Sequence, residues 1–127
     1  MAMSNTLKNF LLDKYLRNTN FAIATVYLSL HTGDPGTTGA NEVSGGSYIR
    51  QAITMSAASG GIITTSADLT FLDMPSCTVT HVGIFDSDTT GGTNVFEQGG
   101  ALTASKVVNA GDTFIIEAGD LSATFTP

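Results

Sequence analysis

The sequence predicts a mainly β protein, a jelly-roll-like antiparallel β-sandwich of about eight strands with one N-terminal α-helix. Apolar and polar residues alternate over short runs, Gly-rich turns separate these runs, and Thr and Ser supply most of the polarity, which suits strand faces. The 127 residues are the length of one domain. We expect residues 1–20 to form the helix and its connection, and residues 21–127 to form the sandwich, with a long loop at 32–47.

The clearest strand pattern lies near the C-terminus. The tripeptide Ala-Gly-Asp occurs at Ala110–Asp112 and again at Ala118–Asp120. Both copies are predicted turns, because Gly accepts positive φ and Asp can hydrogen-bond its own local backbone. Between them Thr113–Glu117 is aromatic and β-branched, and after them apolar residues alternate with hydroxyl residues over Leu121–Thr126. Each copy therefore separates two predicted strands.

Ser4–Arg17 is the only good helix candidate, with Ser4 as its N-cap. The apolar residues that follow the i, i+3, i+4, i+8 spacing are Leu7, Phe10, Leu11 and Tyr15. Leu12 and Leu16 make this stripe wider than one core-facing helix needs. Two interpretations are open: the helix closes one end of the β domain, or its second apolar side packs on a neighbouring subunit. The second predicts that Leu12→Ser with Leu16→Ser weakens assembly more than folding.

Alternating residues predict a strand over Phe21–His31, followed by a long polar loop over Thr32–Ser47. The loop opens with Asp34-Pro35-Gly36, which fits a type II turn. A loop this long inside a compact domain is usually functional or disordered. Thr32–Ser47 is therefore either a contact arm or a mobile surface loop.

The other predicted strands are short. They span Tyr48–Met55, Ile62–Thr65, Leu69–Leu72, Cys77–Asp86 and Thr93–Glu97. Paired glycines, and a turn over Asp86–Gly92, separate the strands. Spacing alone does not give the order or the pairing of these strands.

Composition argues against nucleic-acid and membrane partners. The formal charge is −6, and three of the five Lys and Arg residues fall within the first 17 positions. Nucleic-acid binding needs clustered cations, which the chain lacks. No apolar run approaches the length of a membrane span. Charged residues interrupt the N-terminal segment, so no signal peptide is predicted and synthesis in the cytoplasm is expected.

No metal, cofactor or catalytic residue is predicted. Cys77 is the only cysteine, which excludes an internal disulfide and favours a small core residue. His31 and His81 lack the spacing of a zinc motif, so each is interpreted as a structural residue. Asp86 and Asp88 lack the remaining ligands of an EF-hand and are interpreted as turn residues.

The sequence also lacks the common enzyme motifs. No Gly-x-Ser-x-Gly elbow is present, and the glycines of 33–39 have no following Lys to hold a phosphate. Paired carboxylates of a glycosidase could still meet in the fold. The chain, however, has no Trp to provide a sugar platform. We therefore expect no enzyme, with a small glycan hydrolase as the third hypothesis.

Five segments together resemble a known family. They are Asn9–Leu16, Val26–Gly36, Asn41–Gln51, Thr80–Asp86 and Val108–Phe114. In this order they are similar to small virion structural proteins of tailed bacteriophages, and the resemblance spans nearly the whole chain. Its most specific part is Glu-Val-Ser-Gly-Gly-Ser-Tyr at 42–48.

Members of this family are described either as head decoration (cement) proteins or as tail fibre proteins. The resemblance implies a virion component made in the host bacterial cytoplasm. Small decoration proteins are commonly trimeric β domains between capsomers, which implies the major capsid protein and a homotrimer as partners. The leading hypothesis is thus a cement protein that stabilises the head through contacts across subunit boundaries. The alternative is a tail fibre or baseplate subunit that contacts the host surface.

The contact residues are expected in the helix and near the long loop. They are Leu7, Phe10, Leu11, Tyr15, Glu42, Tyr48 and Arg50. Arg50 is singled out as the only cation between Arg17 and Lys106. Its other interpretation is an ordinary surface residue that pairs with a nearby carboxylate.

Overall fold

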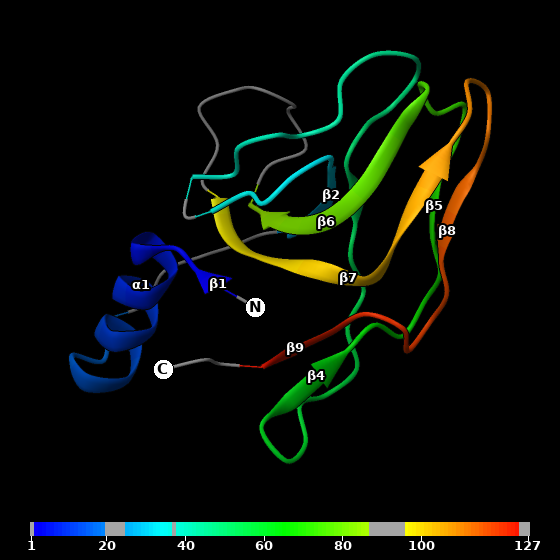
Figure 1. Ribbon diagram of the computed structural model, residues 1–127. Coiled ribbons are helices and arrows are strands. Elements are labelled where there is room, and N and C mark those ends of the chain that lie inside the picture. Colours follow the sequence, from blue (N-terminus) through cyan, green and yellow to red (C-terminus); the bar gives the residue numbers. More distant parts are fainter. Residues whose placement is uncertain (1, 20–24, 37, 87–95, 125–127) are drawn as a thin grey trace.

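In the residues that the structure describes, nine antiparallel strands form one large sheet and two small ones (Figure 1). The structure, a computed structural model, describes residues 2–19, 25–36, 38–86 and 96–124. The elements in this part are β1 (Ala2–Met3), α1 (Asn5–Leu16), β2 (Tyr27–His31), β3 (Gln51–Ala52), β4 (Ile62–Thr64), β5 (Leu69–Phe71), β6 (Cys77–Phe85), β7 (Phe96–Val108), β8 (Phe114–Ile116) and β9 (Ser122–Thr124). The predicted mainly β class with one N-terminal helix is confirmed.

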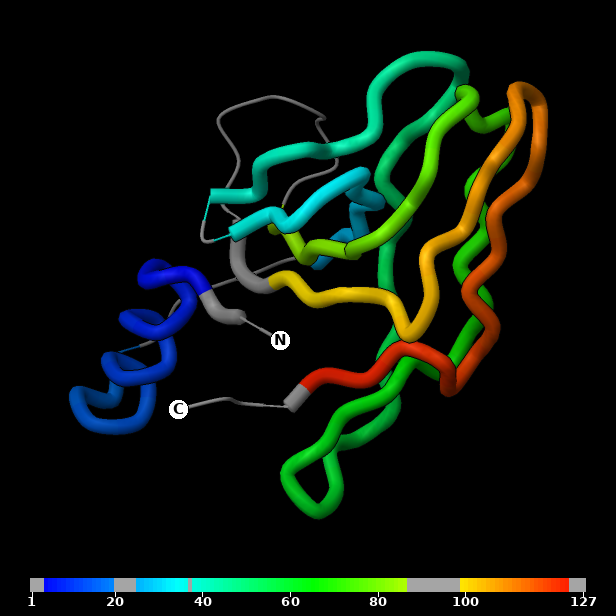
Figure 2. The backbone as a smooth tube through the Cα atoms, viewed as in Figure 1, coloured from blue at the N-terminus to red at the C-terminus, as the bar shows by residue number. Residues whose placement is uncertain are grey.

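The large sheet has the order β1-β7-β6-β2-β3, and the small sheets are β4-β9 and β5-β8. The chain path in Figure 2 shows the β5-β8 pair beside the end of β7 and the β4-β9 pair below the large sheet. The arrangement is sandwich-like. The jelly-roll topology remains a prediction, because the hydrogen-bonded ladders do not form two large sheets.

Several strands differ in extent from the prediction. The predicted strand over Tyr48–Met55 contracts to β3, because only Gln51 and Ala52 meet a partner on β2. β7 runs through Gly99 and Gly100, which the sequence suggested would separate strands. In β7 these glycines pair with β6 on one side, and Gly99 also pairs with β1, so ladder bonds outweigh the weak strand preference of Gly.

Parts of five predictions lie outside the described residues. They are positions 21–24 of the strand over Phe21–His31, position 37 of the loop over Thr32–Ser47, positions 87–92 of the turn that starts at Asp86, positions 93–95 of the strand over Thr93–Glu97, and positions 125 and 126 of the alternating run over Leu121–Thr126.

The core lies between the large sheet and β5-β8. Side chains of β2 and β6 point into it, and they meet Leu69 and Phe71 of β5. Phe71 is 1% exposed, is stacked with Tyr48 at 6.1 Å between ring centroids, and meets the Phe114 ring edge-on at 6.3 Å. These ring contacts join β5, β8 and the segment before β3 into one apolar cluster.

β2 is buried on both faces, which explains why it carries polar residues inside the protein. Leu28 and Leu30 point to the core, whereas Ser29 and His31 alternate to the other face, and all four are 0% exposed. Residues 40–50 cover this second face. A polar side chain buried there needs an internal partner.

β7 bends sharply in the middle (Figure 1). Its pairing with β6 passes from His81↔Ala101 to Val79↔Lys106. Four residues of β7 therefore lie opposite the single residue Thr80. This irregular bulge of four residues turns β7 away from the large sheet and brings the C-terminal end of β7 next to β8.

Candidate functional site

The ends of α1 are fixed by local hydrogen bonds. The Ser4 side chain accepts a bond from the Leu7 N–H at 3.2 Å, as the sequence predicted for an N-cap. At the other end the N–H groups of Arg17 and Thr19 donate to the Asp13 carbonyl at 3.0 and 3.2 Å. The helix thus begins and ends close to the predicted Ser4 and Arg17.

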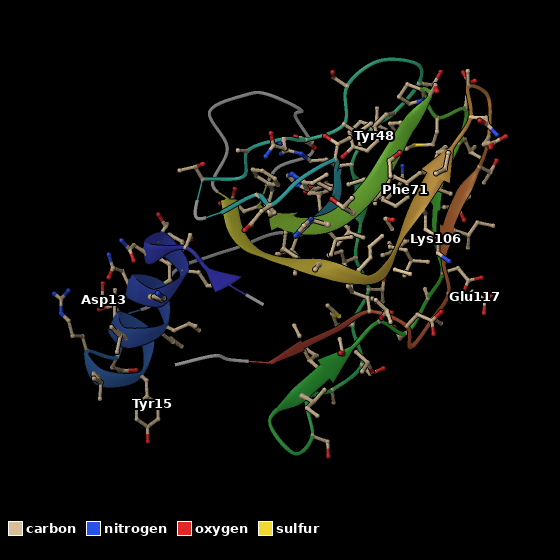
Figure 3. The ribbon with its side chains drawn as sticks, viewed as in Figure 1. Asp13, Tyr15, Tyr48, Phe71, Lys106 and Glu117 are labelled. Atoms are coloured by element: carbon tan, nitrogen blue, oxygen red, sulfur yellow. The ribbon has the colours of Figure 1, made fainter. Side chains whose placement is uncertain are left out.

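The apolar side chains of α1 lie on two sides of the helix. Leu7, Phe10 and Leu11 are half-buried. Tyr15, predicted on the same stripe, is 88% exposed and extends away from the body (Figure 3). The exposed side forms a stripe at i, i+4, i+7, i+8 spacing, here named the helix patch. Its members are Lys8, Leu12, Tyr15 and Leu16.

A groove of about 340 Å³ lies between α1 and the β4-β9 pair. The described residues that line it are all apolar or glycine and include Leu7, Leu11, Ile62, Ile63, Ile84 and Ala123. Small-molecule sites normally add a few converging polar groups that orient the ligand. This groove has none among its lining residues, so its chemistry suits packing rather than ligand recognition.

Glu42, Tyr48 and Arg50, the other predicted contact residues, meet in one buried cluster. Arg50 donates from Nε and Nη2 to the two carboxylate oxygens of Glu42, each at 2.8 Å. The Tyr48 hydroxyl donates to Glu42 Oε2 at 2.8 Å and accepts from the Leu30 N–H at 3.0 Å. The Arg50 and Glu42 side chains are only 1% and 11% exposed.

This cluster is internally satisfied. The Arg50 guanidinium also stacks 3.6 Å over the centroid of the Phe85 ring. Burial, reinforced by the Glu42 charge, raises the pKa of the Tyr48 hydroxyl, which stays protonated and can donate. Arg50 does pair with a carboxylate, as its second interpretation proposed, but inside the fold rather than at the surface. A role of the three residues in contacts between subunits remains a prediction.

His31 sits beside this cluster with both ring nitrogens occupied. Nδ1 lies 2.7 Å from the Ala40 carbonyl and Nε2 lies 2.7 Å from the Ser29 hydroxyl. A carbonyl can only accept, so Nδ1 carries the proton and Nε2 accepts from Ser29. Burial is the main cause that lowers the pKa of His31, which favours this neutral ring.

The long loop folds back along β2. The Val43 N–H donates to the Leu30 carbonyl and the Thr32 N–H to the Asn41 carbonyl, each at 2.9 Å. Further along, the Ser47 N–H donates to the Asp73 carbonyl at 3.0 Å. Gly46 has φ +55°, and an added Cβ would lie 3.0 Å from that same carbonyl, so only Gly fits this turn. The described part of the loop is held by internal bonds, and its role as a contact arm remains a prediction.

A second exposed apolar surface lies on the side of the molecule opposite α1 (Figure 1). Leu72 and Ile115 alternate to the outer face of β5-β8, because the inner face holds Phe71 and Phe114. Val107 and Ile115 line one shallow groove of about 250 Å³. We name this surface the distal patch. It consists of Leu72, Val107 and Ile115, which are 64%, 77% and 53% exposed.

Acidic residues surround the distal patch. Exposed carboxylates flank both strands of the β5-β8 pair, at Asp68, Asp73, Asp112, Glu117 and Asp120. Lys106 is an exposed cation on this side of the molecule (Figure 3). Asp68 and Asp112 accept hydrogen bonds from backbone N–H groups, which fixes the turns beside the strands.

The described residues offer little for catalysis. Among them no group of three or more His, Cys, Asp or Glu residues is placed to hold a metal ion. Cys77 is half-buried, and burial raises the pKa of its thiol, which disfavours the reactive thiolate. In the same part of the chain no helix is long and apolar enough to cross a membrane.

Sequence reasoning missed the distal patch. Phe71-Leu72 and Phe114-Ile115-Ile116 are runs of consecutive apolar residues in strands. In a strand that buries one face, such a run must place an apolar side chain on the other face as well. That signal could have identified Leu72 and Ile115 as exposed.

Comparison with known proteins identifies a family that the chain matches. A family model described as "Podophage GP4 fiber I protein gp80" matches residues 2–124. No curated protein matches the chain. The family match covers α1, every strand and both exposed patches.

Proposed function

The chain belongs to the family of the podophage GP4 fiber I protein gp80, and from this premise we propose that it is a non-catalytic structural subunit of a phage tail fibre. The family makes the protein a virion component, in agreement with the resemblance identified in the sequence. The family description favours the tail fibre hypothesis over a capsid cement protein. The match over residues 2–124 is the observation that carries the proposal.

The surface chemistry is compatible with a structural role. The polar cluster around Glu42 is held by internal bonds, and the described residues that line the apolar groove beside α1 offer no converging polar groups. Exposed apolar side chains instead gather in the helix patch and the distal patch. Apolar patches rimmed by polar residues are typical of protein–protein contact surfaces.

The location in the particle tests the fibre assignment. Copies of the chain in purified particles can be counted against the major capsid protein by quantitative mass spectrometry, and an antibody against the chain can locate it by electron microscopy. We expect a few copies per particle, with the antibody on the tail. A copy number near that of the capsid protein, with label over the head, would overturn the fibre assignment and favour cement.

The non-catalytic part of the proposal has its own test. Purified chain is incubated with host wall glycans, and the products are analysed by mass spectrometry. We expect no turnover. Product release that disappears on substitution of a particular Asp or Glu would instead establish a glycan hydrolase.

A further inference from the structure

We infer that copies of this chain associate head to tail, the helix patch of one copy packing on the distal patch of the next. The inference rests on the proposed structural role and names the partner as a second copy of this chain. Both surfaces expose large apolar side chains, they carry opposite charge, and they lie at opposite ends of the molecule.

The helix patch has too much exposed apolar surface for a helix with no outside partner. Leu12, Tyr15 and Leu16 are 55%, 88% and 71% exposed and follow one another along one side of α1. No residue of α1 is buried. An amphipathic helix normally buries its apolar stripe, and here a second stripe faces outward.

The charges of the two surfaces are complementary. Residues 5–17 contain three cations and one acid, which give a formal charge of +2. The rest of the chain contains two cations and ten acids, a formal charge of −8, so that the whole chain carries −6. Lys8 lies within the helix patch, whereas five exposed carboxylates flank the strands of the distal patch. Opposite potentials favour this pairing and oppose the pairing of two distal patches.

The geometry favours a repeating contact rather than a two-fold one. Figures 1 and 2 show α1 at one side of the molecule and the β5-β8 pair at the other. A two-fold dimer uses the same surface on both subunits, but these surfaces differ in shape and in charge. A contact between two different surfaces generates a closed ring if the rotation between copies closes, or a filament if it does not. The predicted homotrimer would be one such ring.

Sedimentation velocity of the purified chain tests the association over about 1 to 100 μM, the range in which micromolar contacts appear. Two variants each remove one surface: Leu12→Ser with Leu16→Ser, and Leu72→Ser with Ile115→Ser. We expect the wild-type mass to grow with concentration and each variant to need at least about tenfold more protein to associate. Ile49→Ser is the matched control, because Ile49 is 62% exposed and belongs to neither patch.

Mixing the two variants separates a head-to-tail contact from every symmetric one. Each variant retains the surface that the other has lost, so the mixture should form a one-to-one dimer and nothing larger. Association of the distal variant with itself would show a helix-to-helix contact and overturn the inference. A mixture that stays monomeric would overturn it as well. Unchanged thermal unfolding of both variants shows that the substitutions act on association and not on folding.

These outcomes are independent of the fibre assignment. A wild-type chain that is monomeric at the highest concentration would overturn the head-to-tail contact while leaving its location in the particle unaffected. Conversely, the chain could be located on the head and still associate through these two surfaces. The solution experiment and the particle experiment therefore fail separately.

Discussion

The ion pairs of Arg50 and Arg17 show how burial determines what an ion pair contributes to the stability of the fold. Arg50 binds both oxygens of Glu42 with its side chain 1% exposed, whereas Arg17 lies 3.3 Å from one oxygen of Asp13 with its side chain 70% exposed. Water competes for the exposed pair and weakens it. For the buried pair, loss of one partner leaves an uncompensated charge inside the fold.

We therefore expect Glu42→Gln to lower the free energy of unfolding by about 3–5 kcal/mol. Asp13→Asn, the matched control on the exposed pair, should change it by less than about 1 kcal/mol. Urea unfolding followed by circular dichroism measures both. Equal effects of the two substitutions would contradict the view that the Glu42 carboxylate neutralises a buried charge.

The titration of His31, in the same region, makes the stability of the protein depend on pH. Its folded-state pKa is lowered from 6.5, mainly by burial and also by the charges of Arg50 and His81, while the Ala40 carbonyl and Glu42 oppose the shift. Below pH 6.5 the unfolded chain therefore binds more protons than the folded chain. The contribution of the neutral His31 ring to stability is fully present above this value. It is lost as the pH falls from 6.5 toward the lowered pKa of His31 in the folded protein.

We predict that the free energy of unfolding falls as the pH drops below about 6.5, with a slope of at most about 1.4 kcal/mol per pH unit from this one proton. His31→Gln should remove that slope and cost about 1–3 kcal/mol at neutral pH, because buried partners lose their hydrogen bonds. His81→Gln is the control and should retain most of the slope, because burial contributes more to the pKa shift of His31 than the His81 charge does. Urea titrations at several pH values measure it, and a slope that survives in His31→Gln would refute the assignment.

At the scale of elements, α1 is the part of the fold that depends most on local signals. Its cap and its stripe are read within a few residues, so the sequence predicted both ends correctly. Because α1 has no buried residue, tertiary packing contributes less to it than to a core helix. The Ser4 cap, itself 4% exposed, is correspondingly important.

Ser4→Ala should destabilise α1 by about 1 kcal/mol. We expect faster hydrogen exchange of the amides in the first turn, while the exchange of β2 and β6 amides stays at the wild-type rate. Ser4→Thr, which retains a side-chain acceptor, is the control. A uniform increase of exchange through the whole chain would show that α1 unfolds together with the sheet.

The strands and the contact residues depended on information that is distant in sequence. The hydroxyl of Tyr48 accepts a hydrogen bond from the backbone N–H of Leu30, 18 positions away, and the sequence pattern around Tyr48 gave no sign of this bond. β3 pairs only with the first two residues of β2, and both ends of β7 pair with the ends of β6. The sequence pattern shows which side chains share one face of a strand. Which of the two faces is buried depends on how the strands pair and pack.

The segment that carries the most specific resemblance illustrates the same limit. In 42–48, Glu42 neutralises Arg50, Val43 is 2% exposed, and Gly46 allows the turn beside Asp73. These residues hold the loop to the body. A sequence signature can thus identify a family through residues that stabilise the fold, and the predicted role of Glu42 and Tyr48 in contacts between subunits stays a prediction.

At the scale of the whole molecule, charge is distributed unevenly between the two ends. The helix region is basic and the rest of the chain is strongly acidic. Charges on exposed surfaces are screened over about 8 Å at physiological ionic strength. Salt should therefore weaken a contact between the two ends without removing its apolar part.

We predict that raising the salt concentration from about 0.05 to 0.5 M lowers the apparent association constant of the wild-type chain several-fold, as expected for screened surface charges. Lys8→Gln should make the association weaker at low salt and less dependent on salt. Lys106→Gln, which removes a cation from the acidic end, is the opposite control and should not weaken it. Association that strengthens with salt throughout would indicate a contact driven by apolar surface alone.

The bulge of β7 gives the chain one place where its length can change without cost to the rest of the fold. Four residues there lie opposite only Thr80, so removing Ala104 would shorten the corner and leave both flanking registers intact. A deletion at Val82, within the regular ladder, would instead turn every later side chain of β6 to the wrong face. Family members that differ in length should vary at this corner, and a peptide displayed on the particle could be grafted there.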